Sequence, residues 1–305
     1  MVTGCTGLVG HGICFNLLNK GFEVWGTSRG KLISNHELFH PVQFDLKNKP
    51  SIKGISNILN QIDILIHNAA ILPSDKESSF EQFMQINFFS SIELIKRAIK
   101  VGVKQIIYIS ASPVSIQKII SNKIFEINEY SPNDNYGISK VLCEIACKNL
   151  MLNGKSLISV LRFTAPYGYI NNSNAVFSIF FNNTKNNKTI TLWGNGNRVQ
   201  TFTFVEDIGE ACFTIIQKKA VGFYTITGPE KVSMKDLANK IISNFPNSKT
   251  QITYEKKIDP QEGNSIEVST KKIEEELSFS PKFNIDQGIK NILNLNSSNT
   301  FFQKV

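Results

Sequence analysis

Residues 1–10 read M-V-T-G-C-T-G-L-V-G and run directly into a predicted helix over residues 11–20. Three glycines, Gly4, Gly7 and Gly10, recur at three-residue intervals between the apolar start and that helix. Small residues at such a junction let the backbone turn tightly and approach a pyrophosphate placed at the helix N-terminus. The stretch therefore predicts a dinucleotide-binding turn between a first strand and a first helix.

The first strand is unusually short at this point in the chain. Only Met1 and Val2 precede Thr3, whereas a central parallel strand needs about five residues. We therefore expect the natural protein to carry a few more apolar residues before Met1.

Short apolar runs alternate with helical segments through the first half of the chain. Strands are predicted over residues 22–27, 42–45, 62–67 and 105–110, and a long helix over 80–100. This alternation predicts a Rossmann-type α/β fold, with a doubly wound parallel sheet and a smaller C-terminal α/β substrate lobe.

The domain boundaries follow from where the chain leaves and rejoins the predicted sheet. We expect an NAD(P)-binding domain over residues 1–165 with a returning segment at 200–226. The substrate lobe is expected to combine residues 166–198 and 227–305. The polar tail after Leu295 is expected to fray.

A candidate acid/base pair lies on a helix that is predicted to begin near Asn135. Tyr136 and Lys140 are four residues apart, so both side chains occupy one helical face. An ammonium beside a phenol favours the phenolate, which is expected to lower a tyrosine pKa that is normally about 10. Tyr136 is therefore a candidate general acid/base.

Arg29 follows the second predicted strand, where NAD-binding folds commonly carry an acidic residue for the ribose hydroxyls. An arginine at this place suits a 2′-phosphate. The coenzyme is thus expected to be NADP in preference to NAD, with a solvated loop arginine as the alternative.

Serines follow the predicted strand at residues 105–110, in the stretch Ser110–Ser115. A hydroxyl here can hydrogen-bond a substrate oxygen opposite Tyr136. Serines at strand ends also serve simply as turn formers, and the residues alone leave both interpretations open.

Composition narrows the class of protein. The 305 residues are 41% hydrophobic and 19% charged, as in ordinary globular proteins. No apolar run reaches the roughly 20 residues of a membrane span, so we expect no membrane contact and a cytoplasmic location. The five cysteines lack zinc-ligand spacing, and no metal is expected. The net charge of +8 is spread over scattered lysines, which argues against nucleic acid.

Together these motifs resemble the extended short-chain dehydrogenase/reductases, specifically the NAD-dependent epimerase/dehydratase family of sugar-nucleotide enzymes. The matching segments occur in the family's order along nearly the whole chain. They are Thr3–Gly10 (T-G-x-x-G-x-x-G), Asp45-Leu46, Asn68-Ala69-Ala70, Asn87, Pro132–Lys140 (P-x-x-x-Y-x-x-S-K), Leu161–Gly168 (L-R-x-x-x-x-Y-G), Val205–Ile208 (V-x-D-h), Val232–Leu237 and Pro281–Gly288.

The resemblance implies roles for particular residues. Tyr136 would exchange a proton with the substrate while hydride passes to or from nicotinamide, and Lys140 would also bind the nicotinamide ribose. Coenzyme contacts would come from Gly4, Thr6, Gly7, Leu8, Val9, Gly10, Arg29, Asp45, Leu46, Asn68, Ala69, Ala70, Asn87, Ser110, Tyr136, Lys140, Phe163 and Ala165.

Three departures from the family pattern concern the reaction and the substrate. Ala111 stands where the family has its catalytic hydroxyl, so Ser112 is favoured for that role. Ser112 and Pro113 replace the Asp-Glu pair of dehydratases, which disfavours dehydration. Gln200 replaces an arginine that binds the substrate diphosphate, and Arg198 is expected to compensate.

The leading hypothesis is an NAD(P)-dependent enzyme that reduces a keto sugar nucleotide or epimerises a sugar nucleotide, as a homodimer. One alternative is a dinucleotide-binding protein with weak or no catalysis. Another is a reductase of small non-nucleotide carbonyls, which the missing arginine would favour.

Overall fold

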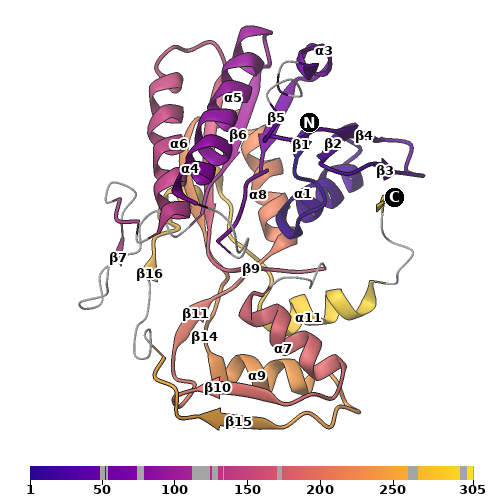
Figure 1. The fold of residues 1–305 in the computed structure, drawn as a ribbon, viewed down its shortest axis with the longest axis vertical. Helices are drawn as coiled ribbons and strands as arrows, with labels where there is room; N and C mark the ends of the chain where they lie inside the picture. The colour runs from indigo at the N-terminus through magenta and orange to yellow at the C-terminus, as the bar shows by residue number, and fades with distance from the viewer. Residues whose placement is uncertain are drawn as a thin grey trace.

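The computed structural model describes residues 1–48, 52, 54–73, 79–111, 124–125, 130–132, 134–169, 174–259, 267–295 and 301–304. Its centre is a seven-stranded sheet in the order β13-β8-β6-β5-β1-β2-β4, in which every neighbouring pair is parallel (Figure 1). The strands are β1 (Val2–Thr3), β2 (Val24–Ser28), β4 (Phe39–Gln43), β5 (Ile64–His67), β6 (Gln105–Ile109), β8 (Leu157–Phe163) and β13 (Gly222–Ile226). The predicted Rossmann-type α/β class is confirmed.

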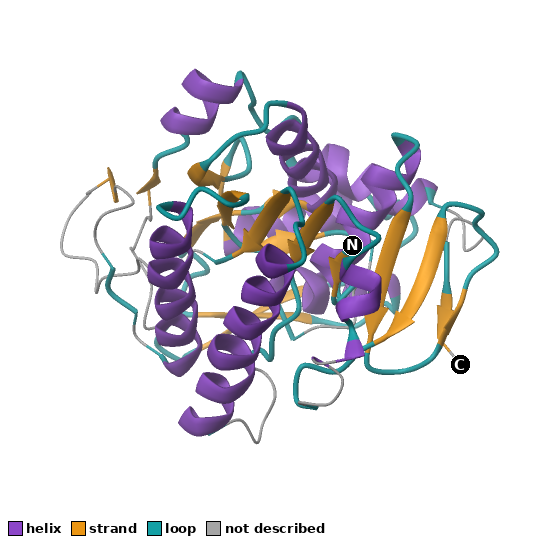
Figure 2. Ribbon diagram, turned by 90° about the horizontal axis from the view of Figure 1, so that it is seen from above, coloured by secondary structure: helices purple, strands orange, loops and turns teal. Residues whose placement is uncertain are grey.

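Helices cover both faces of this sheet, as the view from above shows (Figure 2). Alternate strand residues enter opposite cores: Leu65 and Tyr108 belong to one cluster, Ile66 and Ile107 to the other. This alternation is what a strand buried on both faces requires. The flanking elements are α1 (Leu8–Asn19) and α8 (Val205–Gln217) on one face, with α3 (Ser56–Leu59), α4 (Phe80–Phe83), η1 (Met84–Ser90), α5 (Ser91–Lys100) and α6 (Asn135–Met151) on the other.

The predicted long helix at residues 80–100 is not a uniform α-helix. Its middle, η1, is a π-helix of seven residues between α4 and α5. A π segment makes room for an extra residue per turn and is common at functional sites. Here it contains Asn87, whose contacts are described with the candidate site.

A smaller region lies below the sheet in Figure 1 and has its own core. The lower elements are α7 (Val176–Lys185), β10 (Ile190–Trp193), β11 (Val199–Thr201), β14 (Lys231–Ser233), α9 (Met234–Ser243), β15 (Ile252–Glu255) and α11 (Ile285–Asn294). Short elements elsewhere are β3 (Leu32–Ile33), β7 (Ile124–Phe125), β9 (Pro166–Tyr167), β12 (Thr203–Phe204), β16 (Glu267–Val268), α10 (Lys271–Leu277) and β17 (Gln303–Lys304).

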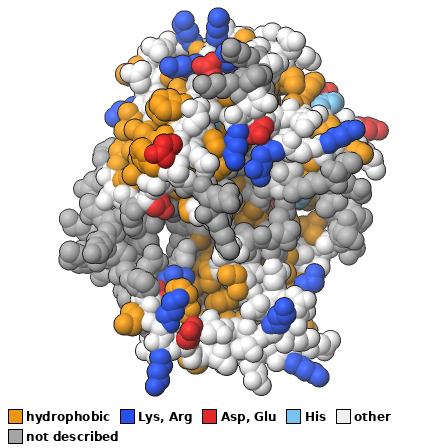
Figure 3. All heavy atoms as spheres, viewed as in Figure 1, with side chains coloured by type: hydrophobic (Ala, Val, Ile, Leu, Met, Phe, Trp, Pro, Cys, Tyr) orange, Lys and Arg blue, Asp and Glu red, His pale blue; other side chains and the backbone are white. Residues whose placement is uncertain are grey.

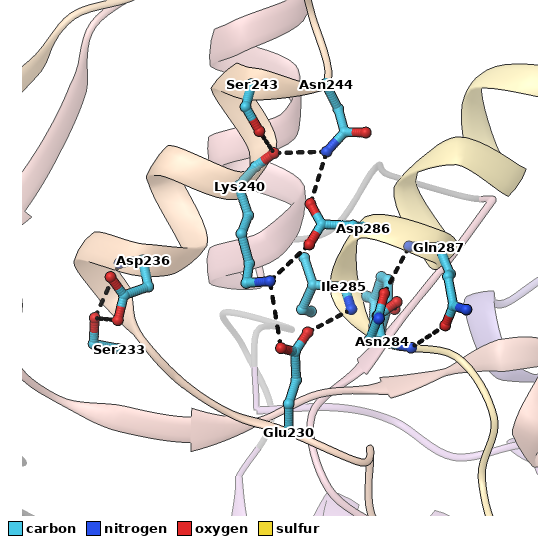
Figure 4. A network of polar contacts seen from close by, with 11 residues as sticks. Glu230, Ser233, Asp236, Lys240, Ser243, Asn244, Asn284, Ile285, Asp286 and Gln287 are labelled. Atoms are coloured by element: carbon cyan, nitrogen blue, oxygen red, sulfur yellow. Dashed lines mark hydrogen bonds and ion pairs between the residues drawn. The ribbon is translucent and has the colours of Figure 1, made fainter.

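A charged network ties the helices of the lower region together (Figure 4). Lys240 of α9 contacts Asp286 of α11 at 2.6 Å and Glu230 at 3.3 Å. Glu230 also accepts the backbone N–H of Ile285 at 2.7 Å, which satisfies a free donor at the start of α11. The hydrogen bond from Lys240 to Asp286 raises the pKa of the lysine.

Asp207, in the first turn of α8, fastens the lower region to the sheet. Its two carboxylate oxygens accept the backbone N–H groups of Lys282 and Phe283 at 2.9 and 3.1 Å. Tyr167 adds a hydrogen bond from its hydroxyl to the carbonyl of Asn284 at 3.0 Å. The chain leading into α11 is thus held by two buried side chains from the sheet side.

A buried ion pair joins α6 to the sheet. The Arg162 guanidinium of β8 donates from Nε to Glu144 Oε1 at 2.7 Å and from Nη2 to Oε2. The two side chains are 3% and 0% exposed. Two parallel donors matched to one carboxylate give this pair the favourable geometry that a desolvated charge requires.

We expect Arg162→Met to lower the free energy of unfolding by about 3–5 kcal/mol, because it leaves the Glu144 carboxylate buried without a partner. The double variant Glu144→Leu/Arg162→Met should recover most of that loss, since no charge then remains buried. Urea denaturation of the wild type and of both variants measures the two effects. A double variant as unstable as Arg162→Met would show that the bare charge is not the cause.

Candidate active site at the carboxyl edge of the sheet

The glycine turn depends on close backbone approach at two positions. Gly4 has φ +69°, and a Cβ there would lie 3.0 Å from Ala69 Cα. A Cβ on Gly10 would lie 2.1 Å from the Gly4 carbonyl oxygen, so no larger residue fits. Gly7 caps α1, which leaves the first-turn N–H groups, including those of Leu8 and Val9, without helical acceptors. Such a helix start can hold a pyrophosphate.

The Thr3 hydroxyl connects this turn to the exit of β5. Its oxygen accepts the backbone N–H groups of Asn68 and Ala69, each at 3.0 Å, and lies 2.8 Å from His67 Nδ1. With both lone pairs engaged, the hydroxyl gives its single proton to Nδ1. His67 is therefore neutral, with its proton on Nε2.

Neither Thr3 nor His67 was singled out from the sequence as a site residue. Both end strands at the carboxyl edge, and that position is the signal that could have found them. His67 is 1% exposed, and burial, aided by the charge of Lys140, lowers its pKa to about 3.

Asn87 uses its side chain within the protein. Its amide accepts the N–H of Ile71 at 2.8 Å and donates to the Ile71 carbonyl at 3.0 Å. It also donates to Ser139 Oγ at 3.2 Å, and Ser139 in turn donates to the Tyr136 carbonyl at 2.7 Å. The π-helix thus braces both the loop after β5 and the first turn of α6.

Tyr136 and Lys140 lie on one side of α6, as their spacing predicts. Asp134 caps the helix by accepting the Gly137 N–H at 2.6 Å. Lys140 is 3% exposed, and its Nζ donates to the Ile109 carbonyl at 2.9 Å. The same nitrogen lies 5.7 Å from the centre of the Tyr136 ring.

The expected lowering of the Tyr136 pKa is wrong for this structure. Burial, with a smaller contribution from the charge of Asp134, raises the pKa of the phenol. Burial lowers the pKa of Lys140 to about 8, against the opposing effects of Cys143, Glu144 and Cys147. Desolvation outweighs the attraction because it disfavours both charged forms, and the ammonium is hydrogen-bonded to Ile109.

The remaining predicted coenzyme residues gather along the same edge. Parallel strands end at one edge of a sheet, and these residues follow β1, β2, β4, β5, β6 and β8. Leu46 is 6% exposed and belongs to the core cluster that contains Leu65 and Tyr108, whereas Arg29 is exposed. The residues at these strand ends are Thr6, Arg29, Asp45, Leu46, Ala69, Ala70, Ser110, Phe163 and Ala165.

Of the two serine candidates, Ser110 is described by the structure. Ser110 is 1% exposed, and its hydroxyl has no hydrogen-bond partner among the described residues. A buried hydroxyl without a partner at this edge is free to meet a ligand oxygen. Ser112 lies outside the described residues.

Arg198 and Gln200 lie in the lower region. Arg198 Nε is 3.6 Å from Asp259, a carboxylate only 8% exposed, and Nη2 donates to Met234 Sδ at 3.4 Å. Gln200 is half-buried on β11, opposite Val232 of β14. Both predicted substrate residues therefore belong to the lower region.

Two negative findings apply to the part of the chain that the structure describes. It contains no helix with the length and apolarity of a membrane span. It also contains no cluster of three or more His, Cys, Asp or Glu side chains that could bind a metal ion.

Acid should destabilise the fold through His67. Below pH 6.5 the unfolded chain protonates this histidine, whereas folded His67, with a pKa of about 3, stays neutral. The unfolded state then binds more protons, so the free energy of unfolding falls by about 1.4 kcal/mol per pH unit between about pH 6 and 4. In urea titrations at several pH values, His67→Asn should remove the contribution of one proton from this dependence of the unfolding free energy on pH. The control His36→Asn, at an exposed position, should leave the dependence unchanged. Equal slopes in both variants would exclude His67 as the cause.

Comparison with known proteins places this geometry in a family. The model of the NAD dependent epimerase/dehydratase family matches residues 1–226. The uncharacterized protein y4nG of Sinorhizobium fredii is 26% identical over 249 residues, and the matched part covers 79% of this chain and 59% of that protein. YtcB of Bacillus subtilis, described as an uncharacterized UDP-glucose epimerase, is 22% identical over 313 residues, covering 95% of each chain.

A solved structure shows the same fold. UDP-glucuronic acid 4-epimerase from Bacillus cereus, in complex with UDP-glucuronic acid and NAD, superposes with a TM-score of 0.80 at 21% identity. The match covers 95% of this chain and 96% of that chain. The predicted resemblance is confirmed: the chain belongs to the NAD-dependent epimerase/dehydratase family, an enzyme family of the extended short-chain dehydrogenase/reductase type.

Proposed function

We propose that the protein is an NAD-dependent enzyme that oxidises and reduces a carbon of a sugar nucleotide, as an epimerase or as a reductase of a keto sugar. The observation that carries the proposal is the placement of Tyr136 and Lys140 on α6, beside the Ile109 carbonyl at the carboxyl edge of the sheet. The glycine turn opens onto the same edge. Relatives described as a UDP-glucose epimerase and as an epimerase bound to UDP-glucuronic acid and NAD support the substrate class.

The residues of the chain divide the chemistry between them. A bound nicotinamide supplies a hydride acceptor or donor. As the neutral phenol, Tyr136 would give its proton to the substrate oxygen during reduction, and as the phenolate it would take the proton of the substrate hydroxyl during oxidation. Lys140, held on Ile109, places a positive charge near the phenol, and a substrate oxygen against Ser110 would be oriented for the transfer.

The coenzyme that we propose is NAD. The glycine turn and the free N–H groups of α1 fit a pyrophosphate, and the solved neighbour contains NAD. The preference for NADP that Arg29 predicts has no support from these relatives. Arg29 is exposed just after β2, where its guanidinium can contact a ribose with or without a 2′-phosphate. The preference for NADP therefore stays a prediction.

The nucleotide end of the substrate is proposed to lie against the lower region. Arg198 lies two residues before Gln200, which takes the place of the missing arginine, but Asp259 offsets part of its charge. Neither alternative function is favoured, because the family is one of enzymes and the relatives are named for sugar nucleotides.

A homodimer is proposed through the outer face of α4, η1 and α6. Large apolar side chains are exposed there: Phe80 by 46%, Phe89 by 58% and Ile145 by 50%. Figure 3 shows hydrophobic side chains gathered over this part of the surface. Contiguous exposed apolar surface on a globular protein marks an interaction site.

Tyr136→Phe should lower kcat by about 10²–10⁴-fold, because it removes the proton that the reaction transfers. NAD affinity should change less than twofold, since the ring and its packing remain. The assay follows sugar-nucleotide products by chromatography and NADH by absorbance, with UDP-glucose and UDP-glucuronic acid as substrates and with NAD and NADP compared.

Tyr254→Phe is the matched control, because Tyr254 is 52% exposed on β15. Full activity in Tyr136→Phe would remove Tyr136 as the acid/base. A wild type that turns over no sugar nucleotide with either coenzyme would remove the proposed reaction.

A further inference from the structure

The end of the chain docks on the sheet far from the helix that precedes it. Residues 301–304 lie beside β3 and β4, whereas α11 lies in the lower region (Figure 1). Phe301 is 7% exposed and belongs to the core cluster formed with α1 and β2. The expectation that the whole tail after Leu295 frays is therefore wrong for residues 301–304.

An aromatic cluster holds this segment in place. The Phe301 ring stacks on His11 of α1, with centres 4.8 Å apart, and lies 5.0 Å from Phe39 of β4. Phe302 lies 5.7 Å from Phe39 and 5.8 Å from His11. Gly26 makes room for the cluster, because a Cβ there would lie 2.3 Å from the Phe39 ring. Burial in this cluster lowers the pKa of His11 to about 4.

Backbone pairing extends the contact toward the end of β2. In β17, Gln303 and Lys304 pair antiparallel with Ile33 and Leu32 of β3. The Ser34 hydroxyl donates to the Phe301 carbonyl. Among the described residues, β17 is the strand that pairs with β3.

The three residues between β2 and β3 form the loop that carries Arg29. Residues 29–31 are exposed. The near end of the loop is anchored by Gln43 Nε2, which donates to the Arg29 carbonyl at 3.2 Å, and by the Ser28 hydroxyl, which donates to the Gly30 carbonyl. Its far end is anchored by the pairing of β3 with β17. A loop held at both ends has less entropy to lose when it binds a ligand.

We propose that Phe301 and Phe302 are positioning residues for the coenzyme: by docking on His11 and Phe39 they hold β3, the Arg29 loop and the first turns of α1 in the binding conformation. His11 lies four residues after Gly7, whose turn would hold the pyrophosphate. The proposal rests on the proposed NAD-dependent function. The adenosine half of the coenzyme is the part that this device would serve, since the loop after β2 is where a dinucleotide ribose binds.

Linkage makes the proposal testable in two directions. If docking of the segment favours coenzyme binding, then coenzyme binding favours docking by the same factor. A purely structural plug would stabilise the fold without this reciprocity. The exchange of backbone amides in the segment therefore separates the two roles.

The test compares wild type, Phe301→Ala/Phe302→Ala and the control Tyr254→Ala, an exposed aromatic at the opposite end of the molecule. Calorimetry should show that the dissociation constant for NAD is about tenfold higher in the double variant, because the loop is then ordered only on binding. The dissociation constant of the control should equal that of the wild type. Hydrogen–deuterium exchange should be faster in residues 28–34 of the double variant and unchanged in β13. In wild type, NAD should slow exchange in residues 301–304.

The possible results separate a failure of the positioning role from a failure of the proposed function. Equal NAD affinity in wild type and double variant, or tail exchange that NAD leaves unchanged, would overturn the inference while leaving the proposed function intact. A wild type that binds neither NAD nor NADP would refute the proposed function itself. If the double variant unfolds, Phe301→Leu, which keeps an apolar side chain but loses the stacking on His11, takes its place, and the exchange of the wild-type tail with NAD still decides.

Discussion

The buried ammonium of Lys140 is the contact on which the candidate site depends. A lysine that is 3% exposed must find hydrogen-bond partners inside the protein. Ile109, the last residue of β6, supplies a carbonyl 2.9 Å from the Lys140 Nζ. The Tyr108 ring adds a face 4.9 Å from Nζ, where a cation is attracted. One turn further along α6, Glu144 is paired with Arg162 of β8. Two charged side chains on one helical face therefore fasten α6 to two neighbouring strands, and Tyr136 takes its position from that attachment.

The same burial that positions the pair also decides its protonation. Desolvation raises the pKa of Tyr136 and lowers that of Lys140, so each group is moved toward its neutral form. The neighbouring ammonium does not by itself make a phenolate. Proton transfer at this site therefore requires a substrate oxygen or a further positive charge brought against the phenol, which ties the acid/base chemistry to a filled site.

Contacts between distant parts of the chain complete the coenzyme half. Thr3 joins β1 to the exit of β5 through three hydrogen bonds, and Asn87 joins that exit to α6. Phe301 adds a segment that is 290 residues away from His11 in the chain. Closing long loops costs little more than closing short ones, so a well-packed aromatic contact can hold the end of the chain on the sheet.

Periodicity and local motifs were enough to determine the parallel sheet, the glycine turn and the shared helical face of Tyr136 and Lys140. These features follow from backbone geometry and from residues close together in sequence, such as the glycines at positions where a Cβ would clash with the backbone. Only the tertiary structure decided the π-helix around Asn87, the hydrogen bonds of Thr3 to His67 and the raised pKa of Tyr136. The docking of Phe301 on His11 belongs with them. Each depends on which groups from distant segments come into contact and on how completely water is excluded from them. The pattern of residues along the sequence contains neither kind of information.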